Sequence, residues 1–280
     1  MTTPTPTTPA FELPEELAID TAAARRIIGE FISAQLDQAG FEKVLLGLSG
    51  GIDSALVAYL AAEAIGPQNV LAVLMPYRTS SPGSRRDAEA VVADLGCASE
   101  LVDISAIVDG YFEHGREDAT PLRRGNFMAR ARMMVLYDHS VTWGGLVIGT
   151  GNKTETLIGY STLWGDSASA FNPIGDLYKS QIRQLSVAIG VPQAIITKAP
   201  SADLWPGQTD EEEVGFSYAE VDRILFRLVD RRLSLDEVVA DGFERELVER
   251  VDRMVAGSDF KRQVPPIAKI GPRTAGIDYL

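Results

Sequence analysis

The sequence predicts an α/β fold in which a parallel sheet carries helices on both of its faces. Apolar runs of strand length alternate along the chain with segments whose apolar residues recur at helical spacing. Two of these runs end in glycine-rich polar turns, at residues 47–51 and 149–151. Ligands bind at the carboxyl ends of the strands in sheets of this kind, so we expect the functional site there.

The first half of the chain contains an N-terminal helix and three strand–helix pairs. Residues 1–14 are rich in Thr and Pro and lack the apolar surface needed to fold alone, so we expect a disordered tail. A helix opens at Pro14 and ends near Gly40, because apolar residues recur at helical spacing between them. In each pair an apolar run precedes a helical pattern: strands at 44–48, 69–75 and 101–104, and helices at 54–65, 84–95 and 107–114.

The second half adds one strand and a larger number of helices. A helix is predicted from Gly125 to about Trp143, and the buried run at 145–150 predicts the fourth strand. The acidic segment 206–213 is interpreted as a mobile loop or lid, with a solvated turn as the alternative. No fixed repeat or internal linker interrupts the chain, so residues 15–280 are predicted to form a single domain. Further helices are expected at 180–189, 218–228, 235–240 and 243–255.

Composition narrows the class of protein. The 280 residues, 45% of them hydrophobic and 23% charged, are enough to bury a substantial core. The formal net charge of −13 argues against broad nucleic-acid binding, which requires a basic face. Cys97 is the one cysteine, so an internal disulfide and a zinc cluster are both excluded. No apolar run approaches the ~20 residues of a membrane span and no signal peptide is found, so we expect a cytoplasmic protein without a membrane partner.

The most informative stretch is the turn after the first predicted strand, Gly47-Leu48-Ser49-Gly50-Gly51-Ile52-Asp53-Ser54. Its glycines permit positive φ, and backbone N–H groups at the start of the next helix form an anion site, most naturally for phosphate. A carboxylate such as Asp53 would repel phosphate unless it holds Mg²⁺, which takes oxygen ligands. The alternative is a tight turn in which Asp53 only caps the helix.

Polar residues also follow the second and fourth predicted strands. The loop at 75–81 carries the cation Arg78 on the expected ligand side, although a solvated loop would look the same. Thr150 could bond a nucleotide, and Glu155 could supply a second carboxylate to a metal. As the alternative, Thr154 caps a helix and Glu155 interacts favourably with its dipole.

Two predicted helices begin with residues suited to anions. Asn126 and Arg130 are four residues apart and share one helix face, which suits phosphate or carboxylate recognition; the alternative is an ordinary surface face. Lys179 lies at a helix start, against the dipole preference, which indicates that it serves an anion. A second basic cluster, which includes Lys261, lies near the end of the chain.

These stretches together resemble the ammonia-dependent NAD synthetases, which belong to the N-type ATP pyrophosphatases. The turn at 48–55 resembles their pyrophosphate loop and lacks the Gly-Lys-Ser/Thr of a Walker loop. The strings that match the family occur in the family's order at 48–55, 125–133, 149–155, 165–179, 200–211 and 260–265.

The resemblance implies a Rossmann-like adenine nucleotide alpha hydrolase fold and a ligase activity, the last step of NAD biosynthesis. Deamido-NAD would be amidated to NAD with free ammonia through an acyl-adenylate, releasing AMP and pyrophosphate from ATP. A homodimer is implied, and the chain has no room for the glutaminase domain of glutamine-dependent relatives.

The resemblance also implies a role for individual residues. ATP would contact Gly47 to Ser54, Arg78, Thr150, Lys179 and Ser201, and Mg²⁺ would be held by Asp53 and Glu155. Deamido-NAD would contact Asn126, Arg130, Tyr160, Phe260 and Lys261. Asp53 and Lys179 would be catalytic, and Asp166 and Asp210 would bind ammonium or metal near the reacting carboxyl group.

Two other functions remain open. The first is another ATP pyrophosphatase, although thiolation usually needs more cysteines and purine amidation would not need the strings around Arg130 and Lys261. The second is an adenine-nucleotide sensor, which would have no need for both Asp53 and Glu155. Turnover of ATP with transfer of nitrogen to deamido-NAD would distinguish the synthetase from both.

Overall fold

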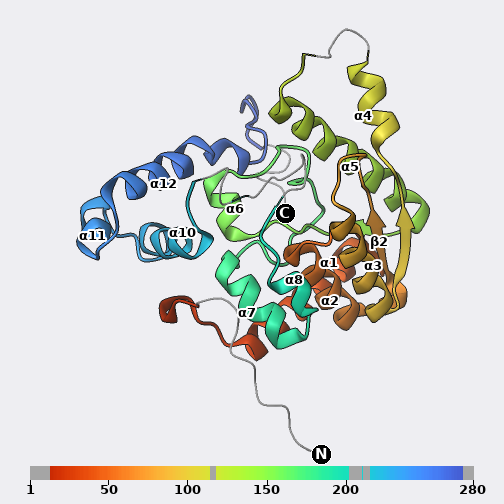
Figure 1. The fold of residues 1–280 in the computed structure, drawn as a ribbon, viewed down its shortest axis with the longest axis horizontal. Helices are drawn as coiled ribbons and strands as arrows, with labels where there is room; N and C mark the ends of the chain where they lie inside the picture. The colour runs from red at the N-terminus through yellow and green to blue at the C-terminus, as the bar shows by residue number, and fades with distance from the viewer. Residues whose placement is uncertain (1–12, 114–117, 202–209, 211–214, 274–280) are drawn as a thin grey trace, which may run out of the picture.

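A computed structural model describes residues 13–113, 118–201, 210 and 215–273 of the chain (Figure 1). Residues 1–12 of the predicted tail lie outside this part, as does the predicted lid at 206–213 apart from Asp210. Within the described part, no helix is both long and apolar enough to cross a membrane.

Four parallel strands form the sheet, in the order β3-β2-β1-β4. They are β1 (Val44–Gly47), β2 (Val70–Leu74), β3 (Ala98–Leu101) and β4 (Leu146–Val147). Val44 at the start of β1 pairs with Val70 on one side and with Leu146 on the other. The predicted parallel sheet is therefore confirmed, with the glycine-rich turn at the end of a central strand.

Two strands have bounds that differ from the expected ones. The third strand begins at Ala98 and ends where the predicted strand began, because Ser99 and Glu100 are exposed at the sheet edge and give no apolar signal. The fourth strand ends at Val147, and the chain beyond it is held by a bridge between Ile148 and Phe171.

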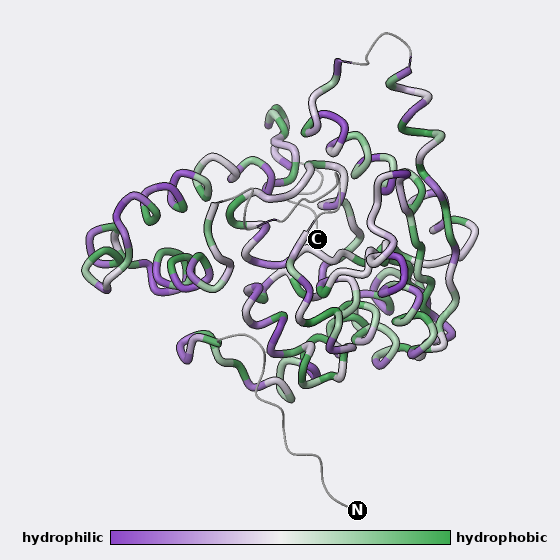
Figure 2. The backbone as a smooth tube through the Cα atoms, viewed as in Figure 1, coloured by the Kyte–Doolittle hydropathy of each residue, from purple (hydrophilic) through white to green (hydrophobic). Residues whose placement is uncertain are grey.

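Helices cover both faces of the sheet. One layer comprises α1 (Thr21–Ala39), α2 (Ile52–Ile65), α3 (Pro82–Leu95), α7 (Lys179–Ile189) and α8 (Gln193–Ile196), and the other α4 (Ser105–Phe112) and α5 (Pro121–Trp143). Because strand side chains alternate between faces, Val44 and Leu46 pack in the first layer and Leu45 in the second. Figure 2 shows apolar residues concentrated along the strands and the helices beside them.

A second apolar core lies beside the sheet. It joins α6 (Lys153–Ile158), α10 (Tyr218–Leu225), α11 (Leu235–Ala240) and α12 (Arg245–Gly257). Leu17 and Tyr178 complete it from distant parts of the chain. Figure 1 shows α10 to α12 grouped away from the strands, and α10 contacts both α6 and α7. The second core therefore joins the rest of the protein through the contacts of α10 with α6 and α7.

Two helices begin at other residues than predicted, because capping residues set their N-termini. The predicted first helix is interrupted after a 3-10 turn (Glu15–Leu17), because the Asp20 side chain accepts hydrogen bonds from two backbone N–H groups and begins α1. Thr120 caps α5 five residues before the predicted start at Gly125. α8 was not predicted, and the remaining short elements are 3-10 turns at Pro67–Asn69 and Asp259–Lys261 and a π-helical turn at Phe226–Asp230.

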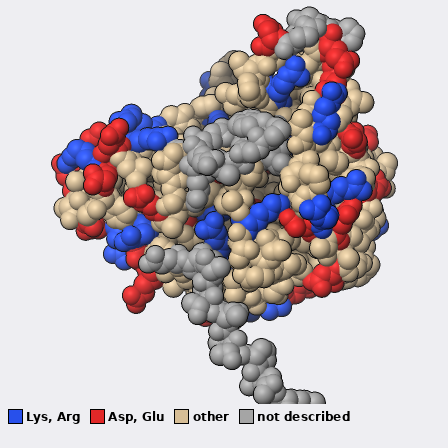
Figure 3. Space-filling view, viewed as in Figure 1, with Lys and Arg blue, Asp and Glu red and all other residues tan. Residues whose placement is uncertain are grey.

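Charged side chains of both signs are mixed on the face shown in Figure 3. Over α10 to α12 many of them form ion pairs: Arg227 contacts both Glu16 and Asp241, and Arg245 contacts Asp236. In its described part, this face therefore presents interspersed charges rather than the extended basic surface typical of nucleic-acid binding.

Candidate active site

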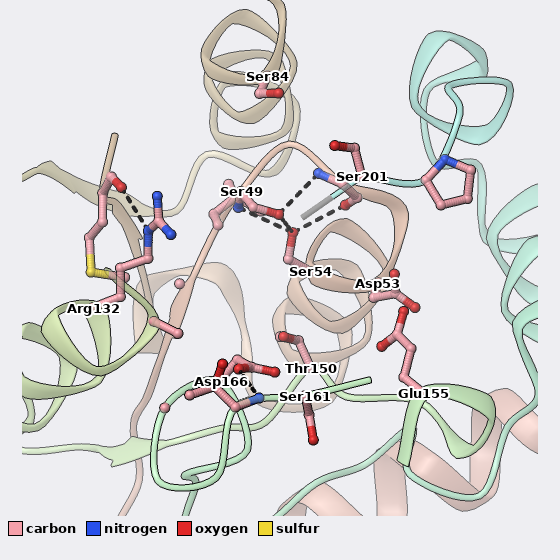
Figure 4. A pocket seen from close by; sticks show the side chains of 18 of the residues that line it. Ser49, Asp53, Ser54, Ser84, Arg132, Thr150, Glu155, Ser161, Asp166 and Ser201 are labelled. Atoms are coloured by element: carbon pink, nitrogen blue, oxygen red, sulfur yellow. Dashed lines mark hydrogen bonds between the residues drawn. The ribbon is translucent and has the colours of Figure 1, made fainter. Parts of the chain in front are cut away.

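A cavity of about 580 Å³ opens at the carboxyl ends of β1, β2 and β4, within the size range of small-molecule sites. The predicted site residues that line it are Gly47, Leu48, Ser49, Gly51, Ile52, Asp53, Ser54, Asn126, Thr150, Glu155, Tyr160, Asp166, Lys179, Ser201, Asp210 and Lys261. Figure 4 shows side chains from these separate segments converging on one space. Of the described candidates, Gly50, Arg78, Arg130 and Phe260 do not line it.

The glycine-rich turn forms one end of the cavity. Gly50 has a φ of +77°, and a Cβ there would lie 2.0 Å from the backbone oxygen of Ser84, so only glycine fits. Gly51 is the N-cap residue of α2, and it offers no side chain to the free N–H groups of the first turn. Ser49 and Ser54 lie beside them, with their hydroxyl oxygens 3.1 Å apart. The Ser54 hydroxyl donates to the backbone oxygen of Gly51 at 3.1 Å, so the donors that the turn offers to an anion are the backbone N–H groups at the start of α2.

Asp53 lies in the first turn of α2, and the alternative that it only caps the helix is wrong, because the N-cap residue is Gly51. Its carboxylate points into the cavity, where it accepts hydrogen bonds from Asn152 Nδ2 at 2.9 Å and from Lys179 Nζ at 2.6 Å. Lys179 Nζ also donates to Glu155 Oε1 at 2.9 Å, and Figure 4 shows the two carboxylates facing each other. Asp53 of α2 and Glu155 of α6 therefore meet at the ammonium group of Lys179, which lies on α7.

Asn152 caps α6, and the alternative that Thr154 does so is wrong. The Asn152 side-chain oxygen accepts the backbone N–H of Glu155 at 2.9 Å, while its amide nitrogen donates to Asp53. One asparagine therefore sets the start of α6 and orients a carboxylate of α2. The capping signal was present in the sequence as a polar residue before a helix.

Burial and neighbouring charges shift the pKa values of Glu155 and Lys179. Burial is the main cause that raises the pKa of Glu155, Lys179 lowers it, and the charges of Asp53 and Asp210 raise it, so that the pKa of Glu155 is about 7. Burial alone would lower the pKa of Lys179, which is 2% exposed, but Asp53 and Glu155 raise it above its ordinary value. The ammonium group therefore stays charged, and the carboxylates around it carry more negative charge than it balances.

Asp210 and Asp166 stand on the cavity wall in different environments. Asp210 is 4% exposed and accepts hydrogen bonds from Tyr160 at 3.1 Å and Tyr218 at 3.3 Å. Asp166 is more accessible than Asp210 and accepts the backbone N–H of Thr162 at 2.8 Å, and burial within the cavity raises the pKa of its carboxyl. Burial raises the pKa of the Tyr218 hydroxyl, and neighbouring carboxylates, Glu155 among them, raise it further, so it acts as a donor to Asp210.

The far wall of the cavity carries groups that suit a polar ligand. Asn126 accepts a hydrogen bond from the Thr162 hydroxyl at 2.8 Å. Lys261 Nζ donates to the backbone oxygens of Gly159 and Ser161 at 2.8 and 2.7 Å, so it fixes the loop that carries Tyr160. This wall therefore combines lysine, amide and phenol donors.

Three predicted contacts lie away from the cavity. Arg78 forms an ion pair with Asp109 and lines a separate hollow. Arg130 donates to the backbone oxygen of Leu163 at 3.1 Å, and Phe260 is 61% exposed. The loop and helix positions of these residues were predictable, but the direction of each side chain was not.

Cations other than the predicted site residues also line the cavity, Lys198 and Arg132 among them. Lys198 Nζ lies 2.8 Å from Asp87 and 3.1 Å from the Ser84 hydroxyl, at the end of the cavity near the glycine-rich turn. Arg132 donates to the backbone oxygen of Met75 at 3.0 Å, which joins α5 to the end of β2. Arg132 belongs to a string that the sequence analysis quoted, whereas Lys198 had only its position before Pro200 as a signal.

The donor set suits a hard cation at Asp53 and Glu155. Both are carboxylates on the cavity wall, and both lie within 3 Å of a single positively charged nitrogen. Among the described residues no cluster of three or more His, Cys, Asp or Glu side chains forms a complete cage. Such a site would complete its coordination with ligand oxygens and water, as Mg²⁺ sites at phosphates do.

Comparison with known proteins gives one consistent result. A family model described as NAD synthase matches residues 25–265. The chain is 54% identical to an NH(3)-dependent NAD(+) synthetase from Trichlorobacter lovleyi over 263 residues, which cover 94% of this chain and 96% of that one.

Two solved structures have a similar fold. The NH3-dependent NAD synthetase from Campylobacter jejuni has a TM-score of 0.77 at 36% identity, and the NMN synthetase from Francisella tularensis 0.80 at 30%. In each case the match covers 90% of this chain and 100% of the other. The predicted adenine nucleotide alpha hydrolase fold is therefore confirmed.

Proposed function

The chain belongs to the NAD synthase family, and from that membership we propose that it makes NAD from deamido-NAD, ATP and ammonia. It is a ligase that forms a C–N bond. The observation that carries this proposal is the 54% identity to an ammonia-dependent synthetase over almost the full length of both chains. ATP is the co-substrate that activates the carboxyl group.

The reaction proceeds in two steps. An oxygen of the nicotinate carboxylate attacks the α-phosphorus of ATP, so a new P–O bond forms while the bond to pyrophosphate breaks. Ammonia then attacks the carbonyl carbon of the acyl-adenylate; AMP leaves, and the nitrogen loses a proton to give the amide. Neither step needs a protein nucleophile, so catalysis consists of positioning and charge stabilisation.

The glycine-rich turn would hold the ATP phosphates. Its backbone N–H groups at the start of α2 are donors at one end of the cavity, and Ser49 and Ser54, whose hydroxyls hydrogen-bond to each other, line the same end. Thr150 and Ser201 line the same cavity from other segments and would contact the nucleotide. Lys198 would add a positive charge near the phosphates.

Lys179 would stabilise the charge that develops at the α-phosphorus. It is almost fully buried and carries a raised pKa, so it can supply a permanent positive charge in a site of low dielectric. Asp53 and Glu155 hold its ammonium group and would also be the ligands of Mg²⁺, which would neutralise charge on the departing pyrophosphate.

Asp210 would serve the ammonia step. It is a buried acceptor on the cavity wall that accepts hydrogen bonds from Tyr160 and Tyr218. Its charge raises the pKa of Glu155. An acceptor of this kind would bind ammonium and receive a proton from the attacking nitrogen. Asp166, which is more exposed, is the second candidate.

Deamido-NAD would occupy the wall formed by Asn126, Tyr160 and Lys261. The same helix that carries Asn126 exposes Met134, Tyr137 and Val141, at 50%, 40% and 82%, along one face. We assign this face to a homodimer contact, on the part of α5 that follows Asn126.

The two cores would act as one functional unit in the cytoplasm. α10 belongs to the second core and contacts α6 and α7, which carry Glu155 and Lys179. Residues 15–280 would therefore form a single domain. A cytoplasmic location agrees with a reaction that consumes ATP.

The test is an incubation of purified protein with ATP, Mg²⁺, deamido-NAD and either ammonium or glutamine, in which NAD, AMP and pyrophosphate are measured. We expect NAD and equal AMP from ammonium and none from glutamine, and no product from an Asp53→Ala variant. Asp37→Ala is a matched control, since Asp37 is exposed near the end of α1.

Other outcomes identify the alternatives. AMP without NAD would indicate a pyrophosphatase with another acceptor, and ATP binding without turnover would indicate a sensor. Because one structural neighbour is an NMN synthetase, nicotinate mononucleotide should be supplied in a parallel reaction. Faster turnover of the mononucleotide would assign that substrate instead.

A further inference from the structure

A buried carboxylate that does not line the cavity links the second core to the active site. Asp222 lies on α10 and is 0% exposed. It shares the apolar face of that helix with Val221 and Leu225, where an acidic residue has no packing role. A buried charge persists only when hydrogen bonds satisfy it, so its partners reveal its role.

The partners of Asp222 are the starts of α6 and α7. Its Oδ1 accepts the hydroxyl of Thr154 at 2.5 Å, and its Oδ2 accepts the backbone N–H and the hydroxyl of Ser180 at 2.7 and 2.6 Å. Three donors therefore converge on one carboxylate. As an anion at the N-terminus of α7, it is also favoured by the dipole of that helix.

The chain of hydrogen bonds continues to Lys179. The Thr154 hydroxyl donates its proton to Asp222 and therefore accepts with its oxygen, which takes the backbone N–H of Lys179 at 2.9 Å. Thr154 directly precedes Glu155, and Ser180 directly follows Lys179. Asp222 thus fixes the backbone beside both residues of the ion pair.

The same helix also contacts the other end of Lys179. Tyr218 lies four residues before Asp222, and hence on the same side of α10. Its ring centroid is 5.1 Å from Lys179 Nζ, a distance typical of a cation–π contact. α10 therefore holds Lys179 at its backbone through Asp222 and at its charged group through Tyr218.

From this arrangement we infer that Asp222 is a positioning residue for the amidation reaction, which sets Lys179 and Glu155 relative to each other through Thr154 and Ser180. The inference rests on the proposed function. Asp222 does not line the cavity, so its loss should affect the rate of adenylation rather than the binding of deamido-NAD. It also gives α10 and the second core a function in catalysis.

The test uses Asp222→Asn together with a pair of substitutions at Thr154. Asp222→Asn preserves shape and removes the charge, and Thr154→Val removes the hydroxyl that joins Asp222 to Lys179. We expect each to lower kcat about 10–100-fold, the usual effect of losing a residue that orients a ligating group. The KM for deamido-NAD should stay within about twofold of the wild-type value.

Rescue and control variants separate positioning from stability. Thr154→Ser restores the hydroxyl and should recover most of the lost kcat. Ser186→Ala removes a buried hydroxyl on α7, the helix that begins at Lys179; this hydroxyl has no hydrogen-bond partner within the described structure, and its loss should leave kcat unchanged. The double variant Asp222→Asn with Thr154→Val should be no slower than the slower single variant, because both break one chain of contacts.

The outcomes distinguish this inference from the proposed function. If the wild type makes no NAD, the reaction itself is wrong and the inference fails with it. If the wild type is active but folded Asp222→Asn and Thr154→Val variants keep more than half of its kcat, only the role of Asp222 is wrong. Should Asp222→Asn fail to fold, the comparison of Thr154→Val with Thr154→Ser still decides the question.

Discussion

Replacing Glu155 with Gln should stabilise the protein above neutral pH while it abolishes activity. In the folded protein the Glu155 carboxyl is buried beside Asp53, and its side chain is 18% exposed. Glutamine has the same shape and keeps an oxygen that can accept a hydrogen bond from Lys179. The substitution therefore removes a charge that folding disfavours and preserves the contact.

The expected gain in the free energy of unfolding follows from the pKa of Glu155, which rises from an ordinary value of 4.5 to about 7 on folding. The folded state then binds more protons than the unfolded chain between these values, so the free energy of unfolding falls as pH rises through this window. At about 1.4 kcal/mol for each tenfold change in the equilibrium, the full effect is roughly 3 kcal/mol. At pH 5 the carboxyl costs under about 1 kcal/mol, because the folded state is protonated and the pH is only half a unit above the ordinary value of 4.5.

Urea titrations of wild type and Glu155→Gln at pH 5, 6, 7 and 8, without ATP and with a chelator, would measure this effect. The variant should gain roughly 2 kcal/mol over the wild type between pH 5 and pH 8. Glu30→Gln, at a surface position that is 66% exposed, should show a difference below about 1 kcal/mol at every pH. A variant that is less stable at pH 8, or a difference that does not change with pH, would refute the reasoning.

Three further predictions concern the same end of the cavity. Lys179→Met should lose about 3–5 kcal/mol of stability at pH 8, measured by urea titration, and all NAD formation, because Asp53 and Glu155 lose their shared cation. Gly50→Ala should lower the melting temperature by the equivalent of at least 1–2 kcal/mol and slow ATP turnover, because the φ of Gly50 is +77° and a Cβ there would meet the backbone of Ser84. As the control, Gly110→Ala lies in open space within α4 and should instead raise the free energy of unfolding by roughly 0.5–1 kcal/mol. The Mg²⁺ concentration that gives half-maximal activity should rise about tenfold for each pH unit below 7, because Glu155 must lose its proton to bind metal; an unchanged requirement at pH 6 and 8 would exclude Glu155 as a ligand.

Capping and edge positions explain most differences between predicted and observed elements. The interrupted first helix was marked by Asp20, a good N-cap residue, within a continuous apolar pattern that concealed it. The third strand was displaced because Ser99 and Glu100 lie at an exposed edge and give no apolar signal. Periodicity reports which residues are buried, so it is least informative where an element is exposed on most sides.

The side chains whose surroundings the sequence did not predict share one property. Arg78 and Arg130 are in the predicted loop and helix, yet their guanidinium groups pair with Asp109 and with a backbone oxygen outside the cavity. Asp222 and Lys198 gave no motif of their own, and their hydrogen-bond partners Ser180 and Asp87 are distant from them in the chain. Side-chain direction depends on packing against other elements, which no local pattern specifies.

The sequence by itself determined the parallel α/β architecture and the glycine-rich turn that begins α2. Both follow from local physics: strand and helix periods differ, and a turn with Gly50 at positive φ exposes the N–H groups of the helix it precedes. The tertiary structure alone decided that Asp53 and Lys179, 126 residues apart, meet with Glu155 in one buried cluster. A pKa near 7 for Glu155 likewise arises only there, because burial and neighbouring charge exist only once the sheet, α6, α7 and α10 have packed together.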